Sequence, residues 1–293
     1  MADTTDFRAE KMFSVKDYVC VVTGGGSGIG LMSAQALAAN GAKVYITGRR
    51  VEALETAAKF HNPGPYGGEI IPLGPCDVTK KADLEKLYED LAKREKHINL
   101  LVAAAGISGP KAEPNKSNAT SLKENLWNNE SFEEWNDTYN TDVTSVYFTT
   151  VALLPLLQAA SESHGKLAAS VIVISSMSGI MRHAQGHFSY NAAKGATVHL
   201  SKLMSAEFQK ANIRVNSIAP GYFPSEMTAK ESGRDQKSEL PDEKVQEKGH
   251  VPAERGGHDE EMGMAVLFLA KNRYVNGEIL AVDGGVLNVV AGR

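Results

Sequence analysis

The stretch Thr23-Gly24-Gly25-Gly26-Ser27-Gly28-Ile29-Gly30 decides the fold of this chain. It follows a short apolar run at residues 18–23 and opens a helical pattern at residues 29–40. Glycines here let the backbone turn sharply and let a pyrophosphate approach the main chain, while the following helix presents free N–H groups to it. No Gly-Lys-Ser/Thr follows, which excludes the loop of nucleoside triphosphatases. The stretch therefore predicts a dinucleotide site between the first strand and the first helix.

The rest of the chain alternates in the same way between short apolar runs and longer helical patterns. Strands are expected at residues 18–23, 43–47, 68–73, 100–104, 170–175 and 214–218, with a short last strand at 279–282. Helices are expected at residues 29–40, 50–60, 80–95, 132–160, 189–210 and 259–270. Such alternation predicts βαβ units. We therefore expect one α/β domain over residues 1–293, a Rossmann fold with a doubly wound parallel sheet and helices on both faces.

Composition and charge narrow the choice of partners. The 293 residues are 42% hydrophobic, and 31 basic against 35 acidic residues give a net charge of −4 with no long basic block. This argues against nucleic acid or an anionic membrane as a partner, and no apolar run approaches the roughly 20 residues of a membrane span. Two isolated cysteines, Cys20 and Cys76, and an N-terminus without an apolar core favour a reducing, cytoplasmic location.

Two polar segments interrupt the alternation. Residues 108–131 contain Pro110 and Pro114, and we interpret them as an inserted loop. Residues 223–257 contain three prolines and a dense run of charges, and we interpret them as a substrate lid. Both segments follow strands, and ligands of open α/β sheets bind outside the carboxyl ends of the strands. The alternative interpretation of the charged run is a solvated surface helix.

The end of the second strand indicates which dinucleotide is bound. An NAD site places an acidic side chain there for the ribose, but this chain has Arg49 and Arg50. A guanidinium pairs with a 2′-phosphate in forked geometry, so NADP(H) is expected. The alternative is that these arginines merely start an exposed helix. Asp77 and Val78 follow the third strand, where Asp77 either holds the adenine amino group or caps the next helix.

Three side chains near the middle of the chain suggest acid–base chemistry. Tyr190 and Lys194 are four residues apart on one predicted helix, so both can face the same cleft. A phenol is a weak acid at neutral pH, but a neighbouring ammonium favours the phenolate and lets it exchange a proton with a substrate oxygen. Ser176, at the end of the preceding strand, can hold that oxygen.

With these motifs the chain resembles the short-chain dehydrogenase/reductase (SDR) family over nearly its whole length. The sequence of residues 218–228 is similar to that of fungal members of the family. The resemblance implies Ser176, Tyr190 and Lys194 as the catalytic set. It also extends to a C-terminal signature at residues 282–285. Members generally assemble through their long helices, so a homodimer or homotetramer is expected. The residues expected to bind the cofactor are Thr23, Gly24, Gly26, Ser27, Gly28, Ile29, Gly30, Arg49, Arg50, Asp77, Val78, Ala104, Ala105, Gly106, Tyr190, Lys194, Pro220, Gly221, Phe223, Ser225 and Met227.

Two departures from the family pattern stand out. Ala103 and Ala104 replace two asparagines that normally brace the sheet, so a repacked strand is expected. Asp142 stands where the family has a catalytic Asn that bends its helix and holds a water beside the active-site lysine. An ionised Asp142 would favour the charged form of Lys194, whereas a protonated one would resemble the amide. We expect turnover to survive with a shifted pH profile.

The sequence thus predicts an NADP(H)-dependent oxidoreductase that reduces a carbonyl, or oxidises an alcohol, of a small organic substrate in fungal secondary metabolism. One alternative is a non-redox cyclase, dehydratase or isomerase that uses NADP as a structural or electrostatic element. Another is a cofactor-binding regulator without catalysis. His183 and His187 precede Tyr190 and could line the pocket, but no third ligand stands at a recognisable spacing, so no metal is expected.

Overall fold

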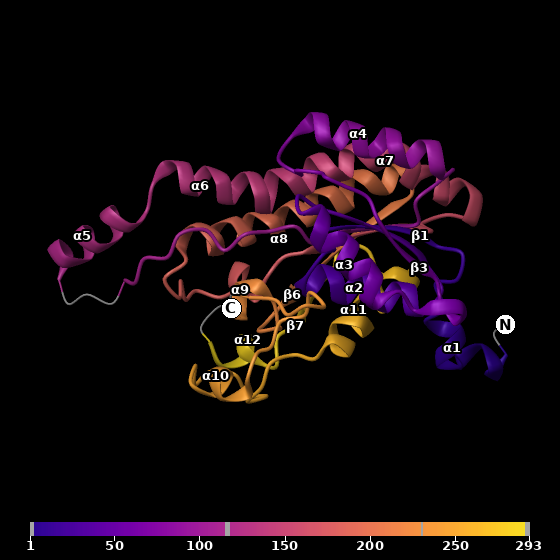
Figure 1. The fold of residues 1–293 in the computed structure, drawn as a ribbon. Helices are drawn as coiled ribbons and strands as arrows, with labels where there is room; N and C mark the ends of the chain where they lie inside the picture. The colour runs from indigo at the N-terminus through magenta and orange to yellow at the C-terminus, as the bar shows by residue number, and fades with distance from the viewer. Residues whose placement is uncertain (1–2, 115–117, 230, 291–293) are drawn as a thin grey trace.

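The computed structural model describes residues 3–114, 118–229 and 231–290, and in these ranges seven strands form one parallel sheet (Figure 1). The order across the sheet is β3-β2-β1-β4-β5-β6-β7. The strands are β1 (Val19–Thr23), β2 (Lys43–Thr47), β3 (Glu69–Pro72), β4 (Leu100–Ala103), β5 (Ala169–Ile174), β6 (Ile213–Pro220) and β7 (Ile279–Val282). The predicted doubly wound Rossmann sheet is confirmed, and its order reverses between β1 and β4, where such sheets bind ligands.

Helices cover both faces of this sheet (Figure 1). The main helices are α2 (Gly28–Ala39), α3 (Val51–His61) and α11 (Asp259–Lys271) on one face, and α4 (Lys81–Arg94), α7 (Ser145–His164) and α8 (Phe188–Phe208) on the other. Shorter helices are α1 (Ala9–Met12), α5 (Ala119–Asn129), α6 (Phe132–Tyr139), α9 (Glu226–Ala229), α10 (Asp242–Gln246) and α12 (Val286–Val289). Short 3-10 turns lie at Thr4–Phe7, Gly64–Tyr66, Met177–Gly179 and Gln209–Ala211.

The apolar runs of the sequence become strands that are buried on both faces. Along β1, Cys20 and Val22 pack into the core on the α2 side, while Val19 and Val21 pack into the core on the α4 side. Because successive side chains of a strand point to opposite faces, a sheet between two helical layers needs apolar residues at every position. This explains why the predicted strand boundaries lie within two residues of the observed ones.

The two interrupting segments contain helices. The segment predicted as an inserted loop, residues 108–131, holds α5, and the Asn118 side chain caps this helix by accepting from the N–H of Ser121 at 3.0 Å. Figure 1 shows α5 at the end of a projection that extends away from the sheet. The lid holds α9 and α10, so the alternative of a surface helix applies to part of it. The segment interpreted as an inserted loop therefore contains a helix, because a polar sequence with a good N-cap can form one.

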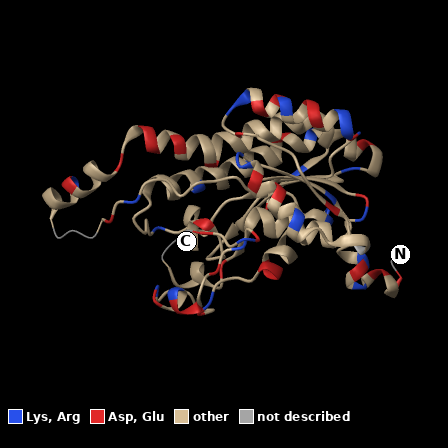
Figure 2. Ribbon diagram, in the orientation of Figure 1, with Lys and Arg blue, Asp and Glu red and all other residues tan. Residues whose placement is uncertain are grey.

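The longest helical stretch runs from Phe132 to His164 through α6, one π-helical turn (Asn140–Thr144) and α7. By length and mean hydropathy (1.5) it could cross a membrane, contrary to the expectation from apolar runs. In this fold it packs against α4 and the sheet, and 44% of its apolar window is buried. Figure 2 shows charges of both signs along the neighbouring helix α4, which covers part of it. Its apolar residues thus serve as one layer of the domain.

A buried arginine joins β6 to the end of α11. The side chain of Arg214 is fully buried, and its guanidinium donates to the carbonyl oxygens of Leu269 (2.9 Å), Ala270 (3.0 Å), Val275 (3.1 Å) and Leu167 (3.0 Å). The last carbonyls of a helix have no partner within that helix, and a basic side chain satisfies them. Arg214 therefore fixes α11 on the sheet.

We expect Arg214→Met to lower the free energy of unfolding by at least about 3 kcal/mol, because each buried carbonyl left without a donor costs about 1–3 kcal/mol. Urea unfolding followed by circular dichroism measures this loss. The matched control is Arg273→Met, since Arg273 is exposed and donates once, to the carbonyl of His164. The control should lose less than about 1 kcal/mol. Equal losses in the two variants would contradict the role of Arg214.

Candidate functional site

The carboxyl ends of three neighbouring strands are joined at the glycine turn. The N–H of Gly24 donates to the carbonyl of Thr47 at the end of β2 (2.8 Å). The hydroxyl of Thr23 accepts from the N–H groups of Ala104 (3.1 Å) and Ala105 (3.2 Å), which follow β4. The backbone after β4 is thus held by Thr23, although both asparagines of the family pattern are absent. These contacts shape the edge of the sheet on which the predicted dinucleotide site lies.

The turn itself needs glycine at two positions for different reasons. Gly24 has a φ of +65°, which side chains with a Cβ rarely adopt. A Cβ on Gly30 would lie 2.2 Å from the carbonyl oxygen of Gly24, so only glycine lets α2 start this close to the strand. Ser27, the N-cap of α2, makes no side-chain capping hydrogen bond. The first N–H groups of α2 therefore lack a side-chain partner and could hold a phosphate.

The two arginines after β2 lie in different environments. Arg50 forms a forked ion pair with Glu226 of α9, with Arg50 Nη2 2.8 Å from Glu226 Oε2. In the part of the chain that the structure describes, no carboxylate oxygen lies within 4.0 Å of Arg49. Arg49 therefore fits a 2′-phosphate better, while Arg50 joins the lid to the cofactor side of the sheet.

The sequence offered two roles for Asp77, adenine binding and helix capping, and the structure shows its side chain in a different contact. Its carboxylate accepts from the N–H (3.1 Å) and the hydroxyl (2.7 Å) of Thr79. These hydrogen bonds lower the pKa of the Asp77 carboxyl against its partial burial, and the positive charges of Lys80 and Arg49 add to the effect. The N-cap of α4 is Lys80, so Asp77 does not cap that helix. An ionised carboxylate at this edge could still accept from an amino group.

The start of the lid folds back over the glycine turn. A Cβ on Gly28 would lie 3.0 Å from the Cβ of Ser225, and one on Gly106 would lie 3.6 Å from Met227 Cε. Pro220 ends β6, and Gly221 donates to the carbonyl of Val282 on β7 (2.8 Å). Together these contacts bring most of the residues predicted to bind the cofactor to one edge of the sheet.

Three of the residues predicted to bind the cofactor have side chains in the core. Phe223 is buried with a ring atom 2.4 Å from a Cβ built on Gly257, and Val78 is buried among the side chains under α4. Ile29 packs against the core on the α2 side. These three residues could offer a cofactor their backbone.

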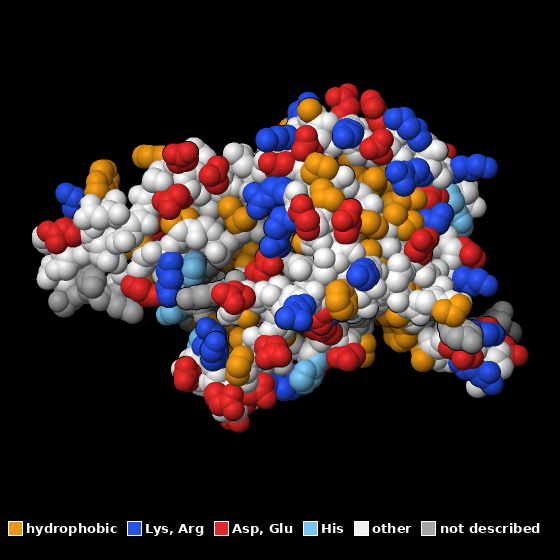
Figure 3. Space-filling view, viewed as in Figure 1, with side chains coloured by type: hydrophobic (Ala, Val, Ile, Leu, Met, Phe, Trp, Pro, Cys, Tyr) orange, Lys and Arg blue, Asp and Glu red, His pale blue; other side chains and the backbone are white. Residues whose placement is uncertain are grey.

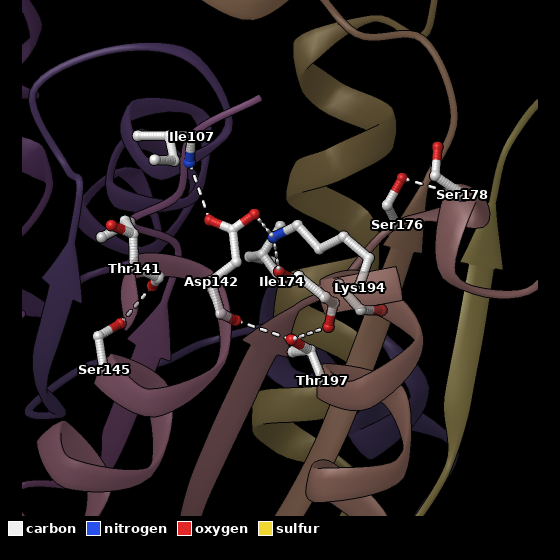
Figure 4. A network of polar contacts seen from close by, with 12 residues as sticks. Ile107, Thr141, Asp142, Ser145, Ile174, Ser176, Ser178, Lys194 and Thr197 are labelled. Carbon is white, nitrogen blue, oxygen red and sulfur yellow. Dashed lines mark hydrogen bonds and ion pairs between the residues drawn. The ribbon is translucent and has the colours of Figure 1, made fainter. Parts of the chain in front are cut away.

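The three predicted catalytic residues lie at the end of β5 and the start of α8. Ser176 follows β5, and its hydroxyl accepts from the N–H of Ser178 at 3.1 Å. Lys194 is buried, and its ammonium donates to the carbonyl of Ile174 at 3.2 Å (Figure 4). The Lys194 Nζ lies 5.5 Å from the centre of the Tyr190 ring, so the ammonium and the phenol share one side of α8 as the spacing predicted. The arrangement places a proton donor, a cation and a hydroxyl together.

Asp142 lies on the π-helical turn and faces Lys194 (Figure 4). One carboxylate oxygen accepts from the N–H of Ile107 at 2.8 Å, and the other lies 3.7 Å from Lys194 Nζ with no hydrogen-bond partner among the described residues. The hydroxyl of Thr197 donates to the Asp142 carbonyl (2.7 Å) and holds the turn against α8. Burial raises the pKa of the Asp142 carboxyl, and the Lys194 ammonium and the Ile107 N–H oppose this shift.

The raised pKa of Asp142 has a consequence for stability that Asp142→Asn tests. The folded protein binds this proton more tightly than the unfolded chain, so the stabilisation is complete below the unfolded pKa of about 4 and is lost as pH rises through the raised folded value. Asp142→Asn removes the titration. We therefore expect its free energy of unfolding to increase relative to wild type as pH rises from about 4 toward neutrality.

Urea unfolding at a series of pH values measures this difference. Asp137→Asn on α6 serves as the control, because Asp137 is exposed and should leave the pH dependence unchanged. Parallel curves for wild type and Asp142→Asn would show that the carboxyl of Asp142 titrates normally.

Several residues at the site were not predicted from the sequence. Thr197 lies three residues after Lys194 on the same helix, so helical spacing could have indicated it. Glu226, by contrast, is 176 residues from Arg50, and no local pattern connects the two. Of the histidines, His183 accepts through its carbonyl from Asn191 (2.9 Å), and burial, with the charge of Lys111, lowers the pKa of His187.

Comparisons with known proteins agree with this geometry. The family model described as enoyl-(acyl carrier protein) reductase matches residues 24–287. The chain is 38% identical to the short-chain dehydrogenase/reductase PhomF of Diaporthe leptostromiformis, over 98% of this chain and 97% of that protein. It is 30% identical to the 3-oxoacyl-[acyl-carrier-protein] reductase of Bos taurus, over 92% of this chain and 98% of the reductase.

A solved structure shares the fold and provides a cofactor complex. The Pseudomonas aeruginosa RhlG/NADP active-site complex superposes with a TM-score of 0.74 at 30% identity, covering 94% of this chain and 98% of that chain.

Proposed function

Because the chain belongs to the short-chain dehydrogenase/reductase family, we propose that it is an NADP(H)-dependent oxidoreductase that reduces a carbonyl, or oxidises an alcohol, of a small organic substrate. The observation that carries this proposal is the grouping of Ser176, Tyr190 and a buried Lys194 at the end of β5. The glycine turn lies two strands away on the same edge of the sheet. The structure of Pseudomonas aeruginosa RhlG is an NADP complex, which supports the choice of cofactor.

In the proposed reaction, each of the three catalytic residues has a separate role. NADPH, when bound, supplies the hydride. The hydroxyl of Tyr190 gives a proton to the carbonyl oxygen, and the hydroxyl of Ser176 holds that oxygen by a hydrogen bond. Lys194 lies beside the Tyr190 ring, and we assign it to the ribose of the cofactor. The protein thus contributes orientation and electrostatics.

To test turnover, the protein is screened against ketones with NADPH. Absorbance measures the consumption of NADPH, and mass spectrometry measures the mass of the product. Wild type should consume NADPH and yield a product heavier by two hydrogens. Tyr190→Phe removes the proton donor and should lower kcat by at least about a hundredfold, the usual contribution of a positioned acid. Tyr274→Phe is the matched control, since Tyr274 follows α11 and its side chain is fully exposed. Turnover without Tyr190 would contradict the assignment.

The mass of the product also separates the proposal from a non-redox cyclase, dehydratase or isomerase. The carboxyl of Asp142 beside Lys194 is the observation that favours this alternative, because a carboxylic acid there could take part in proton transfer. A product of unchanged mass, or one that has lost water, without NADPH consumption would favour it. In the redox enzyme we propose that Asp142 positions Lys194, so Asp142→Asn should retain turnover with a shifted pH–rate profile.

The cofactor test compares NADPH and NADH binding by cofactor fluorescence in wild type, Arg49→Ala and Arg50→Ala. Arg49 has no carboxylate partner among the described residues, whereas Arg50 is paired with Glu226. We expect NADPH to bind wild type at least about tenfold more tightly than NADH, a difference of about 1.4 kcal/mol. Arg49→Ala should abolish this preference and Arg50→Ala should largely keep it. If only Arg50→Ala loses the preference for NADPH, the 2′-phosphate is assigned to Arg50 and not to Arg49.

Our proposal also covers the setting of the reaction. The likeness to PhomF supports a fungal-type member, and we place the activity in fungal secondary metabolism. The buried free thiols of Cys20 and Cys76 support a cytoplasmic location. The exposed side chains of Tyr147 on α7 and Leu203 on α8 support assembly into a homodimer or homotetramer through these helices.

A further inference from the structure

Three segments from different parts of the chain meet beside the catalytic residues. The turn at residues 181–187 lies between Ser176 and Tyr190. On one side it is bound by the root of the inserted segment, where the N–H of Ala112 donates to the carbonyl of Gly186 at 2.7 Å. A Cβ on Gly186 would lie 3.0 Å from Glu113 Oε1 and 3.3 Å from Lys111 Cε, so these side chains lie over the turn.

The end of the lid holds the other side of the same turn. Gln185 Nε2 donates to the hydroxyl of Tyr222 (2.8 Å), and His250 Nε2 lies 3.0 Å from that hydroxyl. Gln185 has a φ of +54°, a conformation that a non-glycine residue keeps only where its surroundings hold it there, often at a functional site. The residue after Ser176, Met177, packs with the lid in an apolar cluster that includes Tyr222. This end of the lid is therefore on the Ser176 side of the cleft.

Positive charge gathers at this meeting point. Lys248 Nζ lies 4.5 Å from the centre of the Tyr222 ring, and among the described residues no carboxylate oxygen lies within 4.0 Å of it. Partial burial lowers the pKa of Lys248, and the nearby charge of Lys111 lowers it further. Figure 3 shows Lys, Arg and His side chains where the projection joins the body, with Asp and Glu side chains beside them. We call Lys111, Gln185, Tyr222, Lys248 and His250 the mouth cluster.

The charge of the mouth cluster is only partly balanced within the chain. The Glu113 carboxylate lies 3.0 Å from Lys111 Nζ and balances that ammonium. Lys248 remains as one ammonium without a carboxylate, next to the hydrogen-bonding groups of Tyr222, Gln185 and His250. An ammonium without a carboxylate partner favours an anionic ligand. One unpaired ammonium matches a monoanion better than a doubly charged phosphate.

We infer that the mouth cluster binds a carboxylate of the substrate, so that the substrate class of this enzyme is ketones that carry a carboxylate at some distance from the reacting carbonyl. This inference rests on the proposed function, because it concerns the same cleft. Lys248 supplies the charge, and the hydrogen-bonded side chains of Gln185, Tyr222 and His250 hold the surface on which the carboxylate rests. The reacting carbonyl then lies deeper, at Ser176 and Tyr190.

The experiment compares matched ketones with NADPH as the reductant: 4-acetylbenzoate, its methyl ester and 4-acetylphenyl phosphate. We expect wild type to reduce the acid with a kcat/KM at least about tenfold above that of the ester, mainly through KM. Lys248→Gln should remove this preference by lowering kcat/KM for the acid. Lys244→Gln is the matched control, an exposed lysine of α10 in the same lid. It should keep the preference for the acid.

The outcomes separate this inference from the proposed function. One outcome is that turnover depends on Tyr190 but that wild type has equal kcat/KM for the acid and the ester. This outcome would overturn the inference and leave the proposed function intact. A higher kcat/KM for 4-acetylphenyl phosphate than for 4-acetylbenzoate would show that the mouth cluster prefers a dianion to a carboxylate. This outcome would overturn the inferred substrate class.

If none of the ketones is reduced, calorimetric titration of 4-acetylbenzoate into the protein with NADP⁺ still decides. Binding at least about tenfold weaker in Lys248→Gln than in Lys244→Gln supports the mouth cluster. Equal binding in the two variants, or no binding to wild type, overturns the inference.

Discussion

The site depends on the burial of one ammonium group. Lys194 lies below the surface, where an unpaired charge is costly. Its partners come from two different elements, the carbonyl of Ile174 at the end of β5 and the carboxyl of Asp142 on the π-helical turn. These contacts fix α8 relative to both elements, and Tyr190 and Ser176 take their places from the same arrangement. A small change in the pairing of Lys194 would therefore move every group of the proposed reaction.

Asp142 makes this pairing unusual for the fold. Its carboxyl is held by the N–H of Ile107, and its turn is held by Thr197, so both the segment after β4 and helix α8 determine where the charge lies. Burial favours the neutral acid, while Lys194 favours the ionised form. The balance between these two effects sets how strongly positive the environment of Tyr190 is. An amide at the same place would have no such balance, because it does not titrate.

The segments that cover the site are anchored by polar contacts between side chains. Arg50 and Glu226 join the start of the lid to the cofactor edge, and Gln185 and His250 join the end of the lid to the turn before Tyr190. Polar contacts at partly exposed positions are weaker than core packing and are opened more readily. A cover built in this way can retain a substrate and still release a product.

The sequence by itself determined the layers of the fold and pointed to the residues of the proposed site. Strands buried on both faces need uninterrupted apolar runs, and a tight turn before a helix needs glycine at positions such as Gly24 and Gly30, so these elements were predictable from local chemistry. The spacing of Tyr190 and Lys194 is likewise a property of one helix. Only the tertiary structure brought Arg50 to Glu226 and Lys248 to Tyr222, whereas the place of Asp142 beside Lys194 was expected from the family resemblance. Such pairs lie far apart along the chain, and their contacts follow from how helices and loops pack on the sheet, which no local pattern of residues encodes.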